Sequence, residues 1–205
     1  ICATTQPGRS AVASSCPAIH GGAGGGGRDE FLRGGYAPPA RDRQLRPMQT
    51  ELTLAHVDRD ITTIPVDAIV NPWNRNFVPR WLLMPGGVSG ALKRKTGPEP
   101  WQDLARHGML DLGQAVTTSA GALPTAKALI HVAGLTVMWK ATPESVRLST
   151  VNAVAEARAH GFRSLAIPLI GAGHGGLTAE ESRTEILRAL DPTAPLHVIV
   201  VEHTP

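Results

Sequence analysis

The fold is decided by residues 164–190, whose sequence is SLAIPLIGAGHGGLTAEESRTEILRAL. A short apolar run, residues 165–170, predicts a buried strand. A loop follows at residues 171–176 and consists mostly of glycine. Thr178 then has the position of a helix N-cap, with Glu180 and Glu181 in the first turn. A strand, a glycine loop and a helix N-terminus in this order favour binding of an anion such as phosphate, because glycine lets the backbone turn sharply and leaves N–H groups free.

The same loop contains the pattern G-x-G-x-x-G, which also occurs in dinucleotide-binding dehydrogenases. Asp191 has the spacing of the acidic residue that those enzymes carry about 20 residues after the loop. Only one further strand, residues 196–201, is predicted after this point, whereas a doubly wound sheet needs several. We therefore expect a phosphate-binding loop near the carboxyl end of its domain, and not a dehydrogenase.

Composition separates an extension from a folded domain. Residues 1–47 contain nine of the 22 glycines and show no periodic apolar pattern. This composition predicts a disordered or non-native extension, with Met48 as the expected native start and residues 48–205 as the domain. No apolar stretch is long enough for a signal peptide or a transmembrane helix, so we expect a cytoplasmic protein without a membrane partner.

Outside the extension the chain is electrically neutral. Six of the 20 lysine and arginine residues precede Met48, as do three of the 17 aspartate and glutamate residues, which leaves 14 of each sign. A neutral domain argues against binding nucleic acid through a basic surface. Both cysteines, Cys2 and Cys16, lie in the extension, and no His/Asp/Glu cluster has metal-ligand spacing. We therefore expect no metal and no cofactor.

Alternation and periodicity predict the order of strands and helices. Strands are expected at residues 51–57, 66–71, 113–119, 126–132, 165–170 and 196–201, and helices at residues 88–96, 101–106, 144–160 and after Thr178. Pro98 and Pro100 are expected to interrupt between the first two helices, residues 72–87 to form a loop, and Gly134 to follow the end of a strand. The apolar residues at helical spacing in 144–160 are Val146, Leu148, Val151, Val154, Ala155 and Ala159. Interleaved strands and helices predict the α/β class, with a mostly parallel or mixed sheet covered on both faces.

Four segments in this order resemble the macrodomain family. They are Asp60-Ile61-Thr62 with residues 66–74, residues 86–91 followed by Gly97, residues 113–116 with 128–132, and residues 167–173 with Gly176. The resemblance covers about residues 51–202, and each motif alone is weak whereas the ordered set is specific. It implies a three-layer α/β/α fold around a central mixed sheet. It also implies binding of ADP-ribose, by some members as readers and by others as hydrolases that remove ADP-ribose from a modified target.

The resemblance also implies roles for individual residues. Asp60 would accept a hydrogen bond from the adenine amino group beside Ile61, and Asn74 would contact the distal ribose. Two glycine-bearing loops would hold the diphosphate through backbone N–H groups, so that a neutral domain needs no lysine cluster. The implied ligand-binding residues are Asp60, Ile61, Asn71, Asn74, Gly86, Gly87, Val88, Ser89, Gly171, Ala172, Gly173, His174, Gly175 and Gly176.

The sequence departs from the hydrolases of the family at the residues that would activate water. One branch has an aspartate where Ser89 stands, and serine is a far poorer base. A second branch uses a lysine near His131 and an aspartate near Gly175, and both are missing. If hydrolysis occurs, we expect a water held by the phosphate of the ligand together with Asn74 or His174, and an oxocarbenium-like transition state. Asn74 and His174 are therefore the catalytic candidates.

Several residues also have purely structural interpretations. Ser89 is expected to be the N-cap of the helix that follows it, and Asp60 has turn capping as its alternative. His131 is expected to be a buried histidine with satisfied hydrogen bonds, whereas His174 either contacts the ligand or is only exposed. Residues 93–95, KRK, are expected on a solvated helix face.

The tryptophans are assigned mainly to packing. Trp73 and Trp81 flank the first loop, where core or rim packing is expected and a lid over the ligand is the alternative. Trp101 and Trp139 are assigned to packing alone.

Two other functions stay open. Ser89 in place of a carboxylate favours a non-catalytic ADP-ribose reader. An RNA or poly(A)-binding module would use the same adenine pocket, but the neutral charge of the domain disfavours it. The expected partner is ADP-ribose or an ADP-ribosylated macromolecule bound by a monomer, and nucleic acid enters only as a modified substrate.

Overall fold

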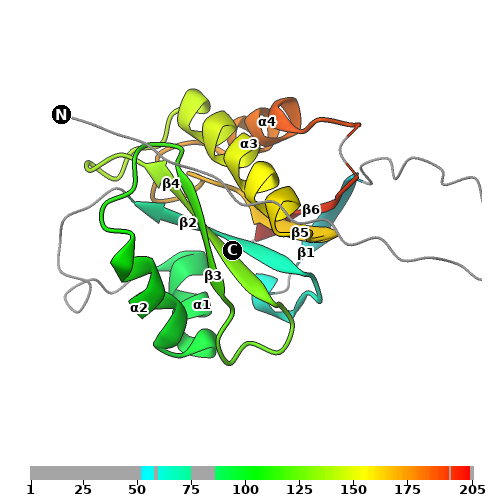
Figure 1. Ribbon diagram of the computed structural model, residues 1–205. Coiled ribbons are helices and arrows are strands. Elements are labelled where there is room, and N and C mark those ends of the chain that lie inside the picture. Colours follow the sequence, from blue (N-terminus) through cyan, green and yellow to red (C-terminus); the bar gives the residue numbers. More distant parts are fainter. Residues whose placement is uncertain (1–51, 58–59, 75–85, 194, 204–205) are drawn as a thin grey trace, which may run out of the picture. The chain divides into compact units, whose positions relative to one another are not determined.

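The computed structural model describes residues 52–57, 60–74, 86–193 and 195–203 (Figure 1). The predicted extension, the predicted start at Met48 and the tryptophan at position 81 lie outside these residues. The elements in chain order are β1 (Leu52–Val57), the 3₁₀ helix η1 (Ile61–Thr63), β2 (Ala68–Asn74), α1 (Gly87–Thr96), α2 (Glu99–Arg106), β3 (Ala115–Ser119), β4 (Ala128–Leu135), α3 (Pro143–Ala159), β5 (Ser164–Pro168), α4 (Ala179–Ala189) and β6 (His197–His203).

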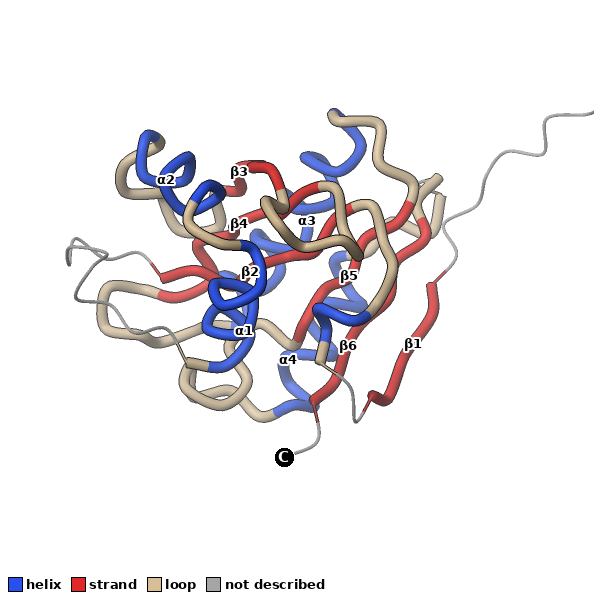
Figure 2. The backbone as a smooth tube through the Cα atoms, turned by 90° about the horizontal axis from the view of Figure 1, so that it is seen from below, coloured by secondary structure: helices blue, strands red, loops and turns tan. Residues whose placement is uncertain are grey.

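The strands form one mixed sheet in the order β1-β6-β5-β2-β4-β3. Every neighbouring pair is parallel except β3 and β4, which are antiparallel. Helices α3 and α4 cover one face of the sheet, and α1 and α2 cover the other (Figures 1 and 2). The predicted three-layer α/β/α architecture is therefore confirmed. Within the described ranges no helix has both the length and the apolar character needed to cross a membrane.

Each face of the sheet has its own apolar core, because alternate residues of a strand point to opposite faces. Ile130 of β4 packs in the cluster that includes Val146 of α3 and Ile186 of α4. Its neighbour Leu129 packs in the cluster that includes Leu92 of α1 and Leu104 of α2. Burial on both faces explains why the central parallel strands β2 and β5 read as apolar runs and not as alternating ones.

The face that α3 buries differs from the apolar pattern in its sequence. Leu148 and Val151 are 42% and 49% exposed, whereas small residues such as Ser149 and Ala153 are completely buried. Small side chains let the helix lie close to β4, where the Ser145 hydroxyl donates a hydrogen bond of 2.9 Å to the Gly134 carbonyl. Close approach to the sheet, and not apolar area alone, thus sets the orientation of α3.

Three predicted boundaries are wrong for identifiable reasons. Strand β2 continues through Asn74 because it stays paired with β4, so the predicted loop does not begin at residue 72. Gly134 lies inside β4, and a Cβ there would come within 2.6 Å of the Ile170 side chain, so this glycine serves close packing. Helix α2 includes Pro100 in its first turn, where a missing backbone N–H costs no helical hydrogen bond.

Asp67 connects the beginnings of three strands. Its carboxylate accepts hydrogen bonds from the N–H groups of Arg163, at 2.8 Å, and Ser164, at 3.2 Å, where β5 begins. It also pairs with the Lys127 ammonium, at 2.6 Å, just before β4. The hydrogen bond from Lys127, aided by those two N–H groups, holds the pKa of Asp67 below its ordinary value despite partial burial.

We expect Asp67→Asn to lower the free energy of unfolding by about 2 kcal/mol at neutral pH, because hydrogen bonds to a charged group are lost. The folded-state pKa of Asp67 is depressed, so its stabilisation is present above the unfolded pKa and is lost as the pH falls through the folded pKa. Urea unfolding should therefore show a constant difference between the two proteins down to about pH 5 and a shrinking difference below about pH 4. A difference that persisted unchanged in strong acid would contradict this role.

Candidate functional site

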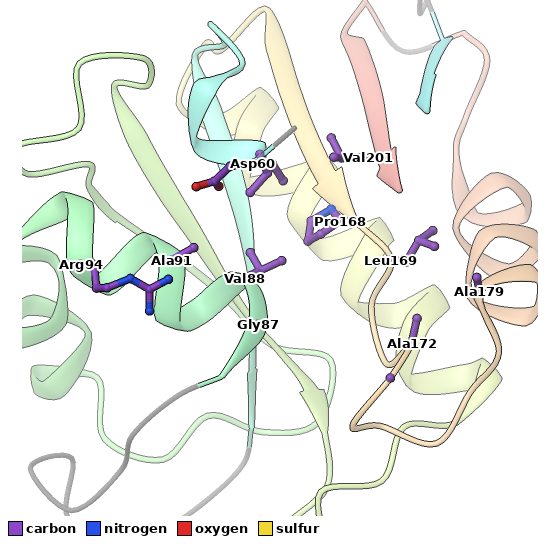
Figure 3. Close-up of a pocket in the computed structure, with 12 residues that line it drawn as sticks. Asp60, Gly87, Val88, Ala91, Arg94, Pro168, Leu169, Ala172, Ala179 and Val201 are labelled. Carbon is purple, nitrogen blue, oxygen red and sulfur yellow. The ribbon is translucent and has the colours of Figure 1, made fainter. Parts of the chain in front are cut away.

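A cavity of about 700 Å³ opens at the carboxyl ends of β5 and β6, between α1 and the loop that precedes α4 (Figure 3). Its lining residues are Asp60, Ile61, Gly87, Val88, Ala91, Arg94, Pro168, Leu169, Ala172, Gly173, Ala179 and Val201. Ligands of open α/β sheets bind in the crevice outside the carboxyl ends of the strands. This size fits a nucleotide-sized molecule.

Asp60 marks one end of the cavity and is held in place by two partners. It is the N-cap of η1, where its carboxylate accepts a hydrogen bond of 3.0 Å from the Thr62 N–H. The Lys95 ammonium lies 3.0 Å from the same carboxylate and also donates to the Thr62 hydroxyl. Partial burial by itself raises the pKa of Asp60. The hydrogen bonds from Thr62 and Lys95 together lower this pKa by more than burial raises it, so the pKa lies below its ordinary value. Asp60 thus caps a turn and lines the cavity as a carboxylate.

Helix α1 presents its N-terminus and one face to the cavity. Gly87, Val88, Ala91 and Arg94 line it at helical spacing. No side chain caps the helix, and the first intrahelical hydrogen bond runs from the Gly90 N–H to the Gly86 carbonyl. The N–H groups of the first turn are therefore left for a ligand, and the helix dipole favours an anion there.

The glycine loop between β5 and α4 is stabilised by its own backbone. The N–H groups of Gly176 and Leu177 donate to the carbonyls of Gly173 and Gly171, each at 3.2 Å. Among the described residues, the N–H groups of Gly173, His174 and Gly175 have no acceptor. Successive free N–H groups in a turn form an anion-binding nest. The two loops meet here, since a Cβ on Gly86 would lie 3.8 Å from the His174 ring.

The glycines of this loop have different tasks. Gly171 and Gly175 are buried, and a Cβ at Gly175 would lie 2.5 Å from the Gly171 backbone. A Cβ at Gly171 would collide with Ala141, which itself donates a hydrogen bond to the Gly175 carbonyl. Gly173 is exposed, lines the cavity and has open space around it at a φ of +82°. Two glycines therefore serve packing, and Gly173 faces the cavity.

A buried polar network lies behind α1. The Ser89 hydroxyl donates to the Asn71 side-chain oxygen at 2.6 Å, and the Asn71 amide nitrogen lies 2.8 Å from Nδ1 of His131. Nε2 of His131 lies 2.9 Å from the Thr118 hydroxyl. The edge of the imidazole packs on Trp101. Because Asn71 accepts from Ser89, its amide donates to Nδ1, which places the proton of His131 on Nε2.

This network corrects two predictions. Ser89 is not the helix N-cap, since Gly86 has that position and Ser89 lies in the first turn with its side chain turned inward. Asn71 is completely buried with both amide atoms bonded, so it supports Ser89 instead of lining the cavity. The expected burial of His131 with satisfied hydrogen bonds is confirmed.

Asn74 follows an irregularity in the pairing of β2 with β4. The register shifts between Trp73 and Asn74, so that Asn74 pairs with Leu135. Bulges of this kind re-aim a side chain and are frequent beside functional sites. Asn74 is 9% exposed, and its amide nitrogen is buried without a hydrogen-bond partner among the described residues. An orphaned donor at this place is satisfied when a ligand supplies an acceptor.

The predicted site residues divide into three groups. Asp60, Ile61, Gly87, Val88, Ala172 and Gly173 line the cavity, whereas Asn71, Ser89, Gly171 and Gly175 are buried around it. Asn74, Gly86, His174 and Gly176 do not line it, and His174 is exposed beside Gly86. The lining residues that the prediction missed are Ala91, Arg94, Pro168, Leu169, Ala179 and Val201. Helical spacing from Val88 was the available signal for Ala91 and Arg94, and the carboxyl ends of parallel strands for Pro168 and Val201.

Two expectations about large side chains change. Residues 93–95 are not simply a solvated face, because Arg94 lines the cavity and Lys95 bonds to Asp60. Trp139 is 43% exposed at a φ of 61°, so it is not a packing residue of the core. Trp73 and Trp101 are buried, as predicted, and the structure adds that their rings contact each other. Across the described ranges no group of three or more His, Cys, Asp or Glu residues is arranged to hold a metal ion.

Comparison with known proteins gives one consistent family. The family model described as Macro domain matches residues 70–186. An uncharacterized protein of Aeropyrum pernix is 33% identical over 152 residues, which cover 69% of this chain and 74% of that protein. An O-acetyl-ADP-ribose deacetylase of Klebsiella pneumoniae is 37% identical over 139 residues, which cover 64% of this chain and 75% of the enzyme.

Solved structures agree in fold. The Oceanobacillus iheyensis macrodomain with ADP has a TM-score of 0.62 and 24% sequence identity, and the match covers 77% of this chain and 86% of that one. Some relatives are longer, since the matched region covers 38% of an uncharacterized protein of Mycobacterium tuberculosis.

Proposed function

This chain belongs to the Macro domain family, and from that premise we propose that its cavity binds ADP-ribose and that the site hydrolyses an ester bond to the terminal ribose. The ester would join ADP-ribose to an acceptor such as a modified protein, and hydrolysis would release free ADP-ribose. One observation supports binding above all others: free backbone N–H groups from two glycine loops meet beside a cavity that has Asp60 at its other end.

In the proposed pose the diphosphate lies between the N-terminus of α1 and the loop at Gly173. Backbone N–H groups then stabilise its negative charge through hydrogen bonds, so that no cluster of lysine residues is needed. The adenine amino group donates to Asp60, whose pKa is held low so that it stays an acceptor. The terminal ribose reaches toward Asn74, whose unpartnered amide nitrogen donates to a ribose oxygen.

The proposed reaction needs little from the protein beyond positioning. A water molecule is held by a phosphate oxygen of the ligand and by Asn74 or His174, and it attacks at the ester. The water oxygen bonds to the carbonyl carbon, and the bond between this carbon and the ribose oxygen breaks. One proton of the water passes to the ribose oxygen, which leaves as a hydroxyl, and the other passes to solvent, so that the acid is released as a carboxylate. The O-acetyl-ADP-ribose deacetylases among the relatives support this class of reaction.

One observation favours a second candidate, a reader that binds ADP-ribose without hydrolysing it. Among the described residues Asp60 is the only carboxylate that lines the cavity, and it lies at the adenine end. Ser89, at the place where relatives of one hydrolase branch have a carboxylate, is committed to hydrogen bonds with Asn71 and Pro72. Among the described residues, a carboxylate that could act as general base beside the ester is therefore missing.

Titration and turnover separate these functions. We expect calorimetry of the full chain to show micromolar binding of ADP-ribose. Incubation with O-acetyl-ADP-ribose, mono-ADP-ribosylated protein and mono-ADP-ribosylated DNA should then release ADP-ribose from at least one substrate. Binding without release would make the protein a reader. No binding would overturn the proposed function.

We expect Asn74→Ala to lower turnover about a hundredfold, the usual effect of removing one oriented donor at a reacting centre. Affinity for ADP-ribose itself should fall less than about tenfold, because the diphosphate contacts remain. Asn152→Ala is the matched control, since Asn152 on α3 donates to the Gly113 carbonyl and lines no part of the cavity. Equal turnover in the Asn74 and Asn152 variants would remove the catalytic role of Asn74.

A further inference from the structure

An arginine on α1 faces the cavity and has no ion-pair partner among the residues that the structure describes. Arg94 lines the cavity on the same helix face as Gly87, Val88 and Ala91. Figure 3 shows its side chain running back along α1 toward the Gly87 end. Long side chains on a helix lean toward its N-terminus, so this is the ordinary direction for an arginine here.

The charge balance at this end of the cavity leaves Arg94 in excess. The other cation nearby, Lys95, lies 3.0 Å from the Asp60 carboxylate and thus neutralises it. No described carboxylate lies within ion-pair distance of Arg94, and its guanidinium makes no hydrogen bond to a described residue. Within the described part of the chain, the lining therefore carries one positive charge that no carboxylate balances.

Position along the helix shows which part of the ligand this charge would meet. An α-helix rises about 1.5 Å per residue, so Arg94 begins about 10 Å from Gly87, at whose N–H groups the diphosphate is placed. The side chain returns over part of that distance. In the proposed pose, its guanidinium is therefore expected beside the adenosine half of the ligand, between the diphosphate and the adenine. In ADP-ribose this half carries no charge, so a guanidinium there has nothing to neutralise.

We propose that Arg94 binds a phosphate group carried on the adenosine ribose, so that the site accepts ADP-ribose bearing a 2′- or 3′-phosphate. This rests on the proposed function, which supplies the pose. A guanidinium presents paired N–H donors in a planar fork that matches two phosphate oxygens, and charge-assisted bonds of this kind are strong. The backbone N–H groups at the other end of the cavity are occupied by the diphosphate, so the extra phosphate depends on Arg94.

The test compares two ligands on three proteins. ADP-ribose and ADP-ribose 2′-phosphate are titrated by calorimetry into the wild type, Arg94→Gln and Lys93→Gln. Lys93 is the matched control, because it lies on the same helix, carries the same charge and does not line the cavity. We expect the wild type and Lys93→Gln to bind the phosphorylated ligand about fivefold to tenfold more tightly than ADP-ribose. In Arg94→Gln this preference should disappear while affinity for ADP-ribose stays within about twofold.

Each other outcome has a distinct meaning. A wild type that binds ADP-ribose but shows no preference for the phosphorylated ligand overturns this inference and leaves the proposed function intact. An equal loss for both ligands in Arg94→Gln assigns Arg94 to the adenine or the diphosphate and also overturns it. Failure of both ligands to bind the wild type overturns the proposed function itself. Competition by adenosine 2′,5′-bisphosphate and adenosine 3′,5′-bisphosphate identifies the hydroxyl, and competition by both no better than that of AMP counts against the inference.

Discussion

Gly173→Glu is expected to abolish measurable binding of ADP-ribose. Gly173 lines the cavity beside free backbone N–H groups, and the space around it is open, so a new side chain would enter the place proposed for the diphosphate. Glutamate adds both bulk and a negative charge there. Two like charges brought together cost several kcal/mol, so calorimetry should show a loss of affinity of about a hundredfold or more.

The control for this variant must carry the same backbone strain. Gly108 has a φ of +70° and open space around it, close to the φ of +82° at Gly173, but it lies after α2 and away from the cavity. Gly108→Glu should therefore lose comparable stability and keep its affinity for ADP-ribose. Normal binding by Gly173→Glu would show that the loop does not hold the diphosphate.

His131→Ala is expected to be the most destabilising single change at the site, lowering the free energy of unfolding by about 3–5 kcal/mol. The imidazole is completely buried and bonded at both nitrogens, so its loss takes the acceptor of the Asn71 amide away and leaves the Thr118 hydroxyl only its bond to the Ser119 carbonyl. It also leaves a void against Trp101, whose ring centre lies 5.4 Å from that of His131. Urea unfolding followed by tryptophan fluorescence measures the loss directly.

An exposed histidine provides the comparison. His107, at the C-cap of α2, is exposed, and His107→Ala should change stability by less than about 0.5 kcal/mol. Should His131→Ala fail to fold, Thr118→Val removes only one hydrogen bond of the network and should cost about 1–2 kcal/mol. If the free energy of unfolding fell by less than about 1 kcal/mol in both variants, the remaining polar groups would have found other hydrogen-bond partners, and the network would not stabilise the fold.

Short-range patterns predicted most of the fold. Thr178 is the N-cap of α4 with a complete capping box to Glu181, and β5 lies where the apolar run before the glycine loop placed it. Both signals lie within a few residues, so a single sequence contains them entirely. The family resemblance, which orders four such segments, is confirmed by the Macro domain match over residues 70–186.

The predictions that were wrong concern contacts between residues far apart in sequence. The network of Ser89, Asn71 and His131 joins positions 18 and 60 residues apart, and nothing local in the sequence shows that Ser89 turns inward. Helix α3 buries its small residues, which permit close packing, and exposes larger apolar ones. The periodicity of apolar residues does not predict this orientation. Arg94 stands in a run of three cations, and only the fold shows that one pairs with Asp60 and another faces the cavity.

The pairing of β1 with β6 has a consequence for synthesis. Leu52 pairs with Val198, so the first described strand of the sheet bonds only to the last. A chain emerging from the ribosome must hold its first strand without a partner until nearly the whole domain has been translated. Contacts of such long sequence separation are slow to form, because the connecting chain must be ordered first. The sheet is thus completed only after β6 has been synthesised, when β6 inserts between β5 and a strand made more than a hundred residues earlier.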